Sequence, residues 1–144
     1  MAKAQNSLGI LVGETARLWR YALDQRLQPL GLSQAKWLVL LHLSRENGLM
    51  QKQLARRVGI EPPTLANLLD RMSTEGWIVR RESSRDRRSK IVQLTPKSLE
   101  VIKQIRSTGA RLRRELLAGI PAKDVERCSA VLTRIKGAVE KVLQ

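Results

Sequence analysis

The sequence predicts a mainly α-helical protein that contains one small β-hairpin. Apolar residues recur at the helical spacings of three and four over most of the 144 residues. Only residues 77–95 change to an alternating pattern, which a charged stretch interrupts. The length fits one domain or two closely joined subdomains, and it is sufficient for a real core. Phe is absent, so Leu, Val and Ile are expected to fill that core.

Two helices are expected before residue 48. The first covers residues 7–28, which contain no helix breaker before Pro29. The second follows Ser33, whose hydroxyl is a good N-cap, and runs to Asn47. Because this second helix is apolar nearly all round, we expect it to be buried.

Two further helices are expected after residue 95. Thr95 is expected to cap a helix that has Pro96 at its first position and Leu99 on its apolar face. The last helix has apolar residues that alternate spacings of three and four without a miss, as in a coiled-coil seam. These seam residues are Val125, Cys128, Leu132, Ile135, Val139 and Val142.

The narrow apolar seam favours packing against one or two long helices. We therefore expect dimerisation through the terminal helices, with Leu8 and Leu11 contributing from the first one. The alternative is that the seam packs on the neighbouring helix, residues 96–118, of its own chain. Cys128 is expected to act as a small apolar residue of this seam rather than as a redox sensor.

Residues 51–74 have the spacing of a helix-turn-helix. Gln51–Val58 is expected to form the first helix, Gly59 a tight turn with positive φ, and residues 62–74 the second helix. If the leucines of the second helix face the core, its exposed face presents side chains that can hydrogen-bond to base edges in a major groove. These are Thr64, Asn67 and Arg71, with Pro63 at the end that enters first.

The alternating pattern of residues 77–94 predicts two strands joined by the polar tip "SSRDRRSK". Next to a helix-turn-helix, such a hairpin would hang over the same face of DNA as a wing. Asp86 is expected to restrain the tip, either by accepting backbone hydrogen bonds or by pairing with the side chain of Arg88. The residues expected to contact DNA are Gln51, Pro63, Thr64, Asn67, Arg71, Arg85, Asp86, Arg87, Arg88 and Lys90.

The composition favours an anionic partner, because the formal net charge is +14 and the isoelectric point is about 11.2. A non-specific nucleoid-type DNA- or RNA-binding protein and a basic membrane-surface adaptor are the alternatives to a sequence-specific regulator. No catalytic constellation, cofactor motif or metal-ligand spacing is visible, and His42 lies in an apolar helix. With a single Cys, no secretory signal and no apolar run of membrane-spanning length, we expect a cytoplasmic protein.

Nearly the whole chain resembles the MarR family of winged helix-turn-helix regulators, and most closely its SlyA branch. The resemblance is carried by "WRYALDQRLQPLGLSQAKWLVL" at 19–40, "QLARRVGIEPPTLANLLDRM" at 53–72, "EGWIVRRESSRDRRSKIVQLT" at 75–95 and the two closing helices. It implies one MarR-type domain over residues 1–144, with a winged helix-turn-helix subdomain at 32–95. Within that subdomain, the helix-turn-helix covers about 47–70 and the wing covers 77–94, while 7–31 and 96–144 are the dimerisation helices.

The resemblance also implies partners. Such regulators are homodimers that bind pseudo-palindromic double-stranded DNA, as repressors or activators, with the wings in flanking minor grooves. Some resemble salicylate-responsive repressors, which implies a small aromatic carboxylate as effector and Arg17, Trp19 and Trp37 near its pocket. SlyA-type recognition helices commonly have an arginine where this chain has Asn67, so no operator sequence is carried over.

Overall fold

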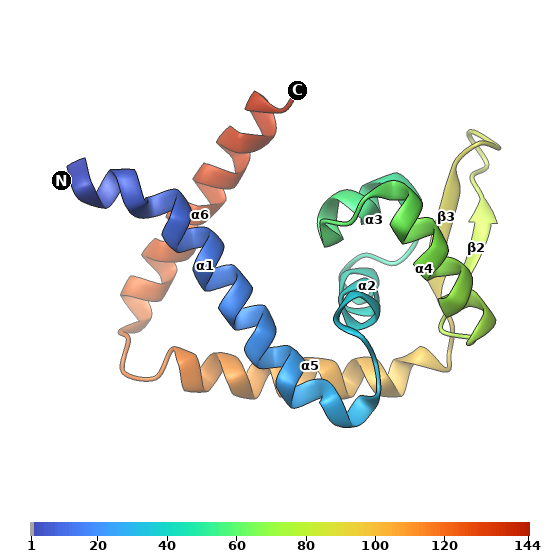
Figure 1. Cartoon of the computed structure of the whole chain (residues 1–144), viewed down its shortest axis with the longest axis horizontal. Coiled ribbons are helices and arrows are strands. Elements are labelled where there is room, and N and C mark those ends of the chain that lie inside the picture. Colours follow the sequence, from blue (N-terminus) through green and yellow to red (C-terminus); the bar gives the residue numbers. More distant parts are fainter. Residues whose placement is uncertain (1) are drawn as a thin grey trace. The chain divides into compact units, whose positions relative to one another are not determined.

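The computed structural model describes residues 2–144 except for the side chain of Asn6, and it is mainly helical with one small antiparallel sheet, as the sequence predicts (Figure 1). The helices are α1 (Ala2–Leu27), the short 3-10 helix η1 (Gln28–Leu30), α2 (Gln34–Arg45), α3 (Gln51–Val58), α4 (Pro62–Thr74), α5 (Ser98–Leu116) and α6 (Ala122–Val142). The strands are β1 (Leu49–Met50), β2 (Ile78–Glu82) and β3 (Lys90–Leu94). None of the helices within this described part combines the length and apolar character that crossing a bilayer requires.

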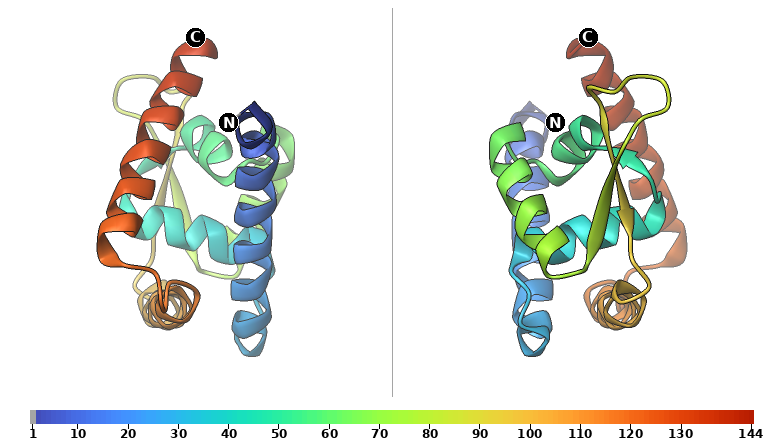
Figure 2. Two further views of the ribbon diagram at one scale, coloured as in Figure 1. Left: turned by 90° about the vertical axis from the view of Figure 1, so that its left-hand side faces the viewer. Right: turned by 90° about the vertical axis from the view of Figure 1, so that its right-hand side faces the viewer.

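The chain forms two compact units, which divide inside α5: one extends to Gly109 and the other is Ala110–Gln144. In the first unit, α2 is the central helix and contacts α3, α4 and β3. Figure 2 shows α2 next to the hairpin of β2 and β3. The largest fully buried side chains of this core come from several elements: Leu27, Trp37, Val39, Leu40, Leu43, Leu49, Leu54, Leu65, Leu69, Met72, Ile78 and Ile105.

The sheet has the strand order β1-β3-β2 and is antiparallel throughout. Val92 of β3 is buried and lies opposite Arg80 on one side and Leu49 on the other. Strand β1 was not predicted, because two residues are too short to produce an alternating pattern. Beyond β1, the Asn47 side chain extends the edge by accepting a hydrogen bond from the backbone nitrogen of Leu94 at 3.0 Å.

The sequence predicted the N-cap of α2 correctly and the N-cap of α5 wrongly. Ser33 is the N-cap of α2, and its hydroxyl accepts a hydrogen bond from the backbone nitrogen of Lys36 at 3.3 Å. Thr95 was predicted to cap the next helix, which is wrong, because its hydroxyl donates instead to the Gly76 carbonyl at 2.6 Å. Helix α5 accordingly begins at Ser98 and not at Pro96.

The buried face of α5 also differs from the prediction. Leu99 was expected on it, yet this residue is 56% exposed. Ser98 takes the buried position of the first turn instead, with its hydroxyl donating to the Thr95 carbonyl at 2.7 Å. Ile102 and Ile105 follow Ser98 at helical spacing and are buried. Leu99, one residue after Ser98, is turned about 100° from Ser98 around the helix axis and lies toward the edge of this face.

Replacement of Leu69 by Ala tests the core. Leu69 is 0% exposed, so Leu69→Ala should lower the free energy of unfolding by about 2–5 kcal/mol through lost burial and the cavity left behind. Urea denaturation measures this loss. Leu143→Ala is the control, because Leu143 is 80% exposed and its truncation should change the value by less than about 0.5 kcal/mol. Equal losses in both variants would contradict the assignment of the core.

Candidate nucleic-acid interface

Helix α4 has one buried and one exposed face, as the sequence predicts. Leu65, Leu68 and Leu69 are buried together with Met72. The side chains expected to contact bases lie on the opposite face and are all exposed: Pro63, Thr64, Asn67 and Arg71. These side chains can donate to and accept hydrogen bonds from base edges, so the exposed face of α4 has the chemistry of a recognition helix.

The turn before α4 brings it close to α3. Gly59 has φ +76°, and its backbone nitrogen and that of Ile60 both donate to the Ala55 carbonyl, at 2.9 and 3.1 Å. Only 4% of Ala55 is exposed, so a larger side chain there would displace the neighbouring helix. This geometry is that of a helix-turn-helix, in which the first helix supports the second.

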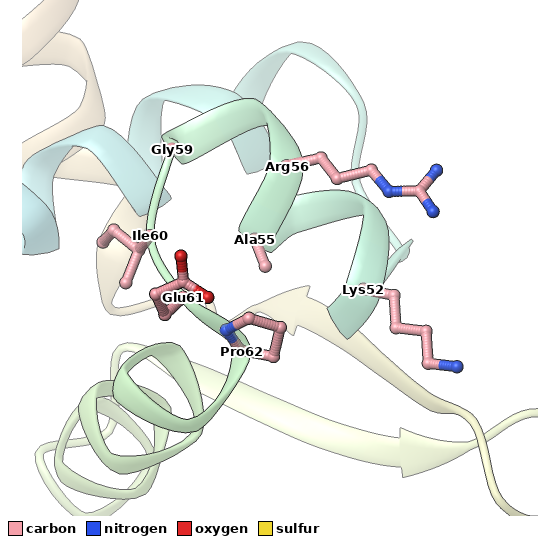
Figure 3. A pocket seen from close by; sticks show the side chains of 7 residues that line it. All are labelled: Lys52, Ala55, Arg56, Gly59, Ile60, Glu61 and Pro62. Atoms are coloured by element: carbon pink, nitrogen blue, oxygen red, sulfur yellow. The ribbon is translucent and has the colours of Figure 1, made fainter. Parts of the chain in front are cut away.

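An open hollow of about 620 Å³ lies at this turn, and we call it the turn hollow (Figure 3). Its lining residues are Lys52, Ala55, Arg56, Gly59, Ile60, Glu61 and Pro62. Figure 3 shows Lys52 and Arg56 extending from the same side of α3, away from Glu61. The sequence prediction missed these two cations, although their spacing of four residues on a polar helix face was the available signal.

The wing tip is closed by Asp86. One carboxylate oxygen of Asp86 accepts the backbone nitrogen of Arg88 at 2.9 Å, and the other accepts the Ser89 hydroxyl at 3.4 Å. The Ser89 backbone nitrogen donates to the Asp86 carbonyl at 3.0 Å, and the Ser89 carbonyl accepts the Ser83 nitrogen at 2.9 Å. Of the two restraints predicted for Asp86, the backbone hydrogen bond forms, whereas no ion pair with the Arg88 side chain occurs within residues 2–144.

A second hollow, of about 440 Å³, lies between the wing tip and the beginnings of α3 and α4. We call it the wing hollow, and it is lined by Met50, Gln51, Lys52, Pro62, Asp86, Arg88, Ser89 and Lys90. It thus brings together four of the residues predicted to contact DNA. The side-chain oxygen of Gln51 is buried and has no hydrogen-bond partner among the residues that the structure describes.

The remaining predicted contacts are spread more widely. Arg85 and Arg87 are exposed at the wing tip, outside the wing hollow. The wing is also joined to the recognition helix, because the Arg80 guanidinium of β2 donates to the Asp70 carboxylate of α4. This ion pair was not predicted, since a separation of ten residues gives no local signal. It connects β2 of the wing with α4, the helix that presents the side chains predicted to contact bases.

His42 does not add to the positive charge of this surface. Burial lowers the pKa of His42, and the neighbouring guanidinium groups of Arg45, Arg57 and Arg20 lower it further. The imidazole is therefore neutral at neutral pH. In residues 2–144 no group of three or more His, Cys, Asp or Glu side chains has the arrangement of a metal site.

The residues predicted to bind an aromatic acid lie in different environments. Trp37 is 1% exposed, and its indole nitrogen donates to the Asp24 carboxylate at 2.8 Å, so it joins α2 to α1 in the core. Trp19 is half-buried and Arg17 is exposed, both on α1.

The residues predicted to form a dimer interface are largely exposed. Leu8 and Leu11 of α1 face solvent in the single chain. Helix α6 has no buried residue, and its seam is exposed everywhere except at the half-buried Val125. The dimer interface, and the alternative that the seam packs on residues 96–118 of its own chain, both stay predictions.

Comparison with known proteins agrees with this geometry. The sequence profile described as the MarR family matches residues 30–89. The crystal structure of transcriptional regulator PA3341 has 44% sequence identity and a TM-score of 0.85, over 93% of this chain and 98% of that one.

Two more distant structures share the fold. The transcriptional regulator SlyA is 20% identical with a TM-score of 0.79, over 93% of this chain and 94% of that one. CouR from Rhodococcus jostii RHA1, bound to p-coumaroyl-CoA, is 22% identical with a TM-score of 0.75, over 89% and 90% of the two chains. The helix-turn-helix, the wing and the similarity to PA3341 over nearly the full length lead to one conclusion: the chain belongs to the MarR family of DNA-binding transcriptional regulators.

Proposed function

We propose that this regulator acts as a homodimer that recognises specific, pseudo-palindromic sites in double-stranded DNA. The observation that carries the proposal is the exposed face of α4, where Thr64, Asn67 and Arg71 lie opposite a fully buried leucine face. Two such helices, one from each protomer, would enter successive major grooves, so the DNA site would repeat the symmetry of the dimer.

Direct reading of bases is assigned to the side chains of α4. Thr64 and Asn67 carry no charge, so they add nothing to the general attraction between protein and phosphate. An amide such as that of Asn67 can make a bidentate pair with adenine. These properties favour sequence-specific binding over the alternative of a non-specific nucleoid-type DNA- or RNA-binding protein.

Contacts with the DNA backbone and the minor groove are assigned to the cations around α4. Arg85 and Arg87 extend from the wing tip, and Arg88 and Lys90 line the wing hollow. Lys52 and Arg56 lie on the exposed side of α3, the helix that crosses the backbone in this type of motif. Each phosphate contact increases the affinity and its dependence on salt concentration.

The acid at the centre of the wing has an orienting role in this proposal. A carboxylate near phosphates repels them, so Asp86 would weaken binding if charge alone decided. Its two oxygens, however, accept hydrogen bonds from Arg88 and Ser89 and close the tip. We infer that Asp86 reduces the freedom of the loop and thereby directs Arg88 toward the DNA.

The homodimer is supported by the exposed apolar surface of the terminal helices. Leu132 is 41% exposed and Val139 is 49% exposed, both on a stripe that continues along α6. Exposed apolar surface of this extent commonly marks a protein-protein interface. A second copy of α1 and α6 would remove it from water, and members of this family function as dimers.

We also propose that the protein belongs to the SlyA branch and responds to an aromatic carboxylate effector. The exposed guanidinium of Arg17 can pair with a carboxylate, and the half-buried ring of Trp19 offers apolar surface on the same helix. The buried Trp37 would contribute by joining α1 to α2. The ligand of CouR includes a coumaroyl group, which supports an aromatic ligand for this fold.

Substitution of Asn67 tests base reading. Asn67→Ala should flatten the preference at one base position per half-site, because a bidentate contact contributes roughly 1–3 kcal/mol of discrimination. Selection of bound sites from a random DNA pool, with wild type and variant in parallel, measures the preference at each position. Thr74→Ala, an exposed substitution at the far end of α4, serves as the control. If Asn67→Ala weakens binding to all sequences equally, Asn67 contacts the backbone instead.

Substitution of Asp86 tests the role of the acid in the wing. Asp86→Ala should leave fold and dimer intact, accelerate hydrogen exchange at the Arg88 amide, and weaken operator binding although it raises the net charge. Arg88→Ala should weaken binding further. Asp86→Asn keeps an acceptor oxygen, so the Arg88 amide should exchange more slowly in this variant than in Asp86→Ala. Tighter operator binding by Asp86→Ala at matched salt would mean that charge repulsion outweighs ordering of the loop.

Two acids in the α6 seam test the dimer. The double variant Leu132→Asp, Ile135→Asp should be monomeric in light scattering and should lose operator affinity, because it places charges in a desolvated interface. The double variant Ala130→Asp, Thr133→Asp is matched in charge and spacing and changes exposed positions outside the seam. A seam variant that stays folded, dimeric and fully active would show that the interface lies elsewhere.

A further inference from the structure

Four side chains meet where α4 ends and the wing begins, and we call this cluster the α5 joint. It consists of Lys36 of α2, Glu75 and Trp77 of the turn between α4 and β2, and Lys97 directly before α5. One carboxylate oxygen of Glu75 accepts the Lys36 ammonium at 2.7 Å. The other accepts the indole nitrogen of Trp77 at 2.9 Å. Both oxygens of the carboxylate are therefore occupied, one by Lys36 of α2 and the other by Trp77 of the same turn.

Lys97 completes the joint from the side of α5. Its ammonium donates to the backbone carbonyl of Glu75 at 2.6 Å and lies 4.5 Å from the centre of the Trp77 ring. Gly76, between these residues, has φ +85°, and a Cβ atom there would come within 3.5 Å of Lys97 Cδ. The aliphatic stem of Lys97 therefore lies directly against the turn, while its charge contacts a carbonyl and an aromatic face.

The turn that the joint holds connects the two DNA-reading elements. Helix α4 ends at Thr74 and strand β2 begins at Ile78, so the orientation of residues 75–77 relates one element to the other. The Thr95 hydroxyl also donates to the Gly76 carbonyl at 2.6 Å, so two residues of the segment before α5 hold this turn. The hydrogen bond from Lys36 lowers the pKa of the Glu75 carboxyl, which keeps the carboxylate ionised at neutral pH.

The joint lies at the opposite end of the recognition helix from Pro63 and Thr64, and close to Arg71, which belongs to the last turn. Helix α4 has 13 residues, from Pro62 to Thr74, and so extends over roughly 20 Å. Lys97 contacts the end beyond Thr74, whereas Pro63 and Thr64 belong to the first turn. The Lys97 ammonium is also directed at the Glu75 carbonyl and the Trp77 ring. Lys97 is thus placed to act on the turn, whereas Arg85 and Arg87 at the wing tip are exposed.

We propose that Lys97 and Glu75 are positioning residues for DNA binding, which set the orientation of α4 and the wing relative to α5 without touching DNA. The inference rests on the proposed function, in which α4 and the wing read the DNA. Through this joint, the segment that leads into α5 would act on the reading elements, so a change in α5 would alter operator affinity.

Lys97→Met is the principal test, because it keeps the stem of the side chain and removes the charge. The full-length variant should bind the selected operator about two- to fivefold more weakly, the loss that corresponds to one cation-π contact of this kind. Lys103→Met is the matched control: it removes the same charge from α5, where Lys103 is exposed and lies 4.0 Å from Glu100. The control should bind like wild type, and Lys97→Arg should restore most of the affinity.

The salt dependence separates positioning from direct contact. If Lys97 touched a phosphate, Lys97→Met would reduce the slope of log K against log salt by about 0.9 and would weaken binding to random DNA equally. A positioning residue should leave the slope unchanged and lower the ratio of specific to random binding. Light scattering and urea denaturation accompany each measurement, so that loss of the dimer or of the fold is recognised.

Glu75→Gln tests the positioning role of the joint independently of Lys97. It keeps an acceptor for Trp77 but loses the ion pair with Lys36, and it should weaken specific binding with an unchanged slope. It replaces Lys97→Met if that variant does not fold. Wild-type affinity in both variants, or a reduced slope, would overturn the inference. The proposed function fails separately, through unchanged base preference in Asn67→Ala, which the joint variants do not affect.

Discussion

The burial of the leucine face of α4 is the constraint on which the interface depends. Because Leu65, Leu68 and Leu69 pack into the core around α2, the rotation of α4 about its axis is determined, and Thr64, Asn67 and Arg71 must face outward. The tight turn at Gly59 adds to this constraint by bringing α3 against the same core. A rotation of α4 by one residue, about 100°, would expose leucine side chains to water and bury the polar ones. Both changes raise the free energy of the folded state, because apolar surface is hydrated and buried polar groups lose their hydrogen bonds.

Net positive charge and directional hydrogen bonds have separate roles in DNA binding by this protein. The excess of fourteen positive charges attracts DNA of any sequence, and in the proposed complex the cations of α3 and the wing contact phosphates on either side of α4. Selectivity must come from side chains with directional hydrogen bonds and from the precision with which they are held. The Asp70–Arg80 ion pair, the Asp86 turn and the α5 joint each hold one part of the proposed DNA-binding surface in relation to another.

The sequence predicts the structure correctly where the signal is local. The bounds of α3, the start of α4 and the cap at Ser33 follow from glycine, proline and hydroxyl side chains that act within four residues, and the structure has them as predicted. The sequence predicts the structure wrongly where a partner from a distant segment competes. Thr95 is a good cap by type, but the carbonyl of Gly76, nineteen residues away, takes its hydroxyl. Similarly, β1 exists only because β3 pairs with it.

By itself, the sequence determined the helical periodicity, the helix-turn-helix spacing, the alternating wing and the positive charge, because each depends on residues within a few positions of one another. Only the tertiary structure decided which polar side chains meet. The Asp70–Arg80 pair, the wing hollow and the contact of Lys97 with Glu75 and Trp77 join residues from separate elements. Their proximity depends on how those elements pack around α2, and no periodicity along the chain encodes a distance between them.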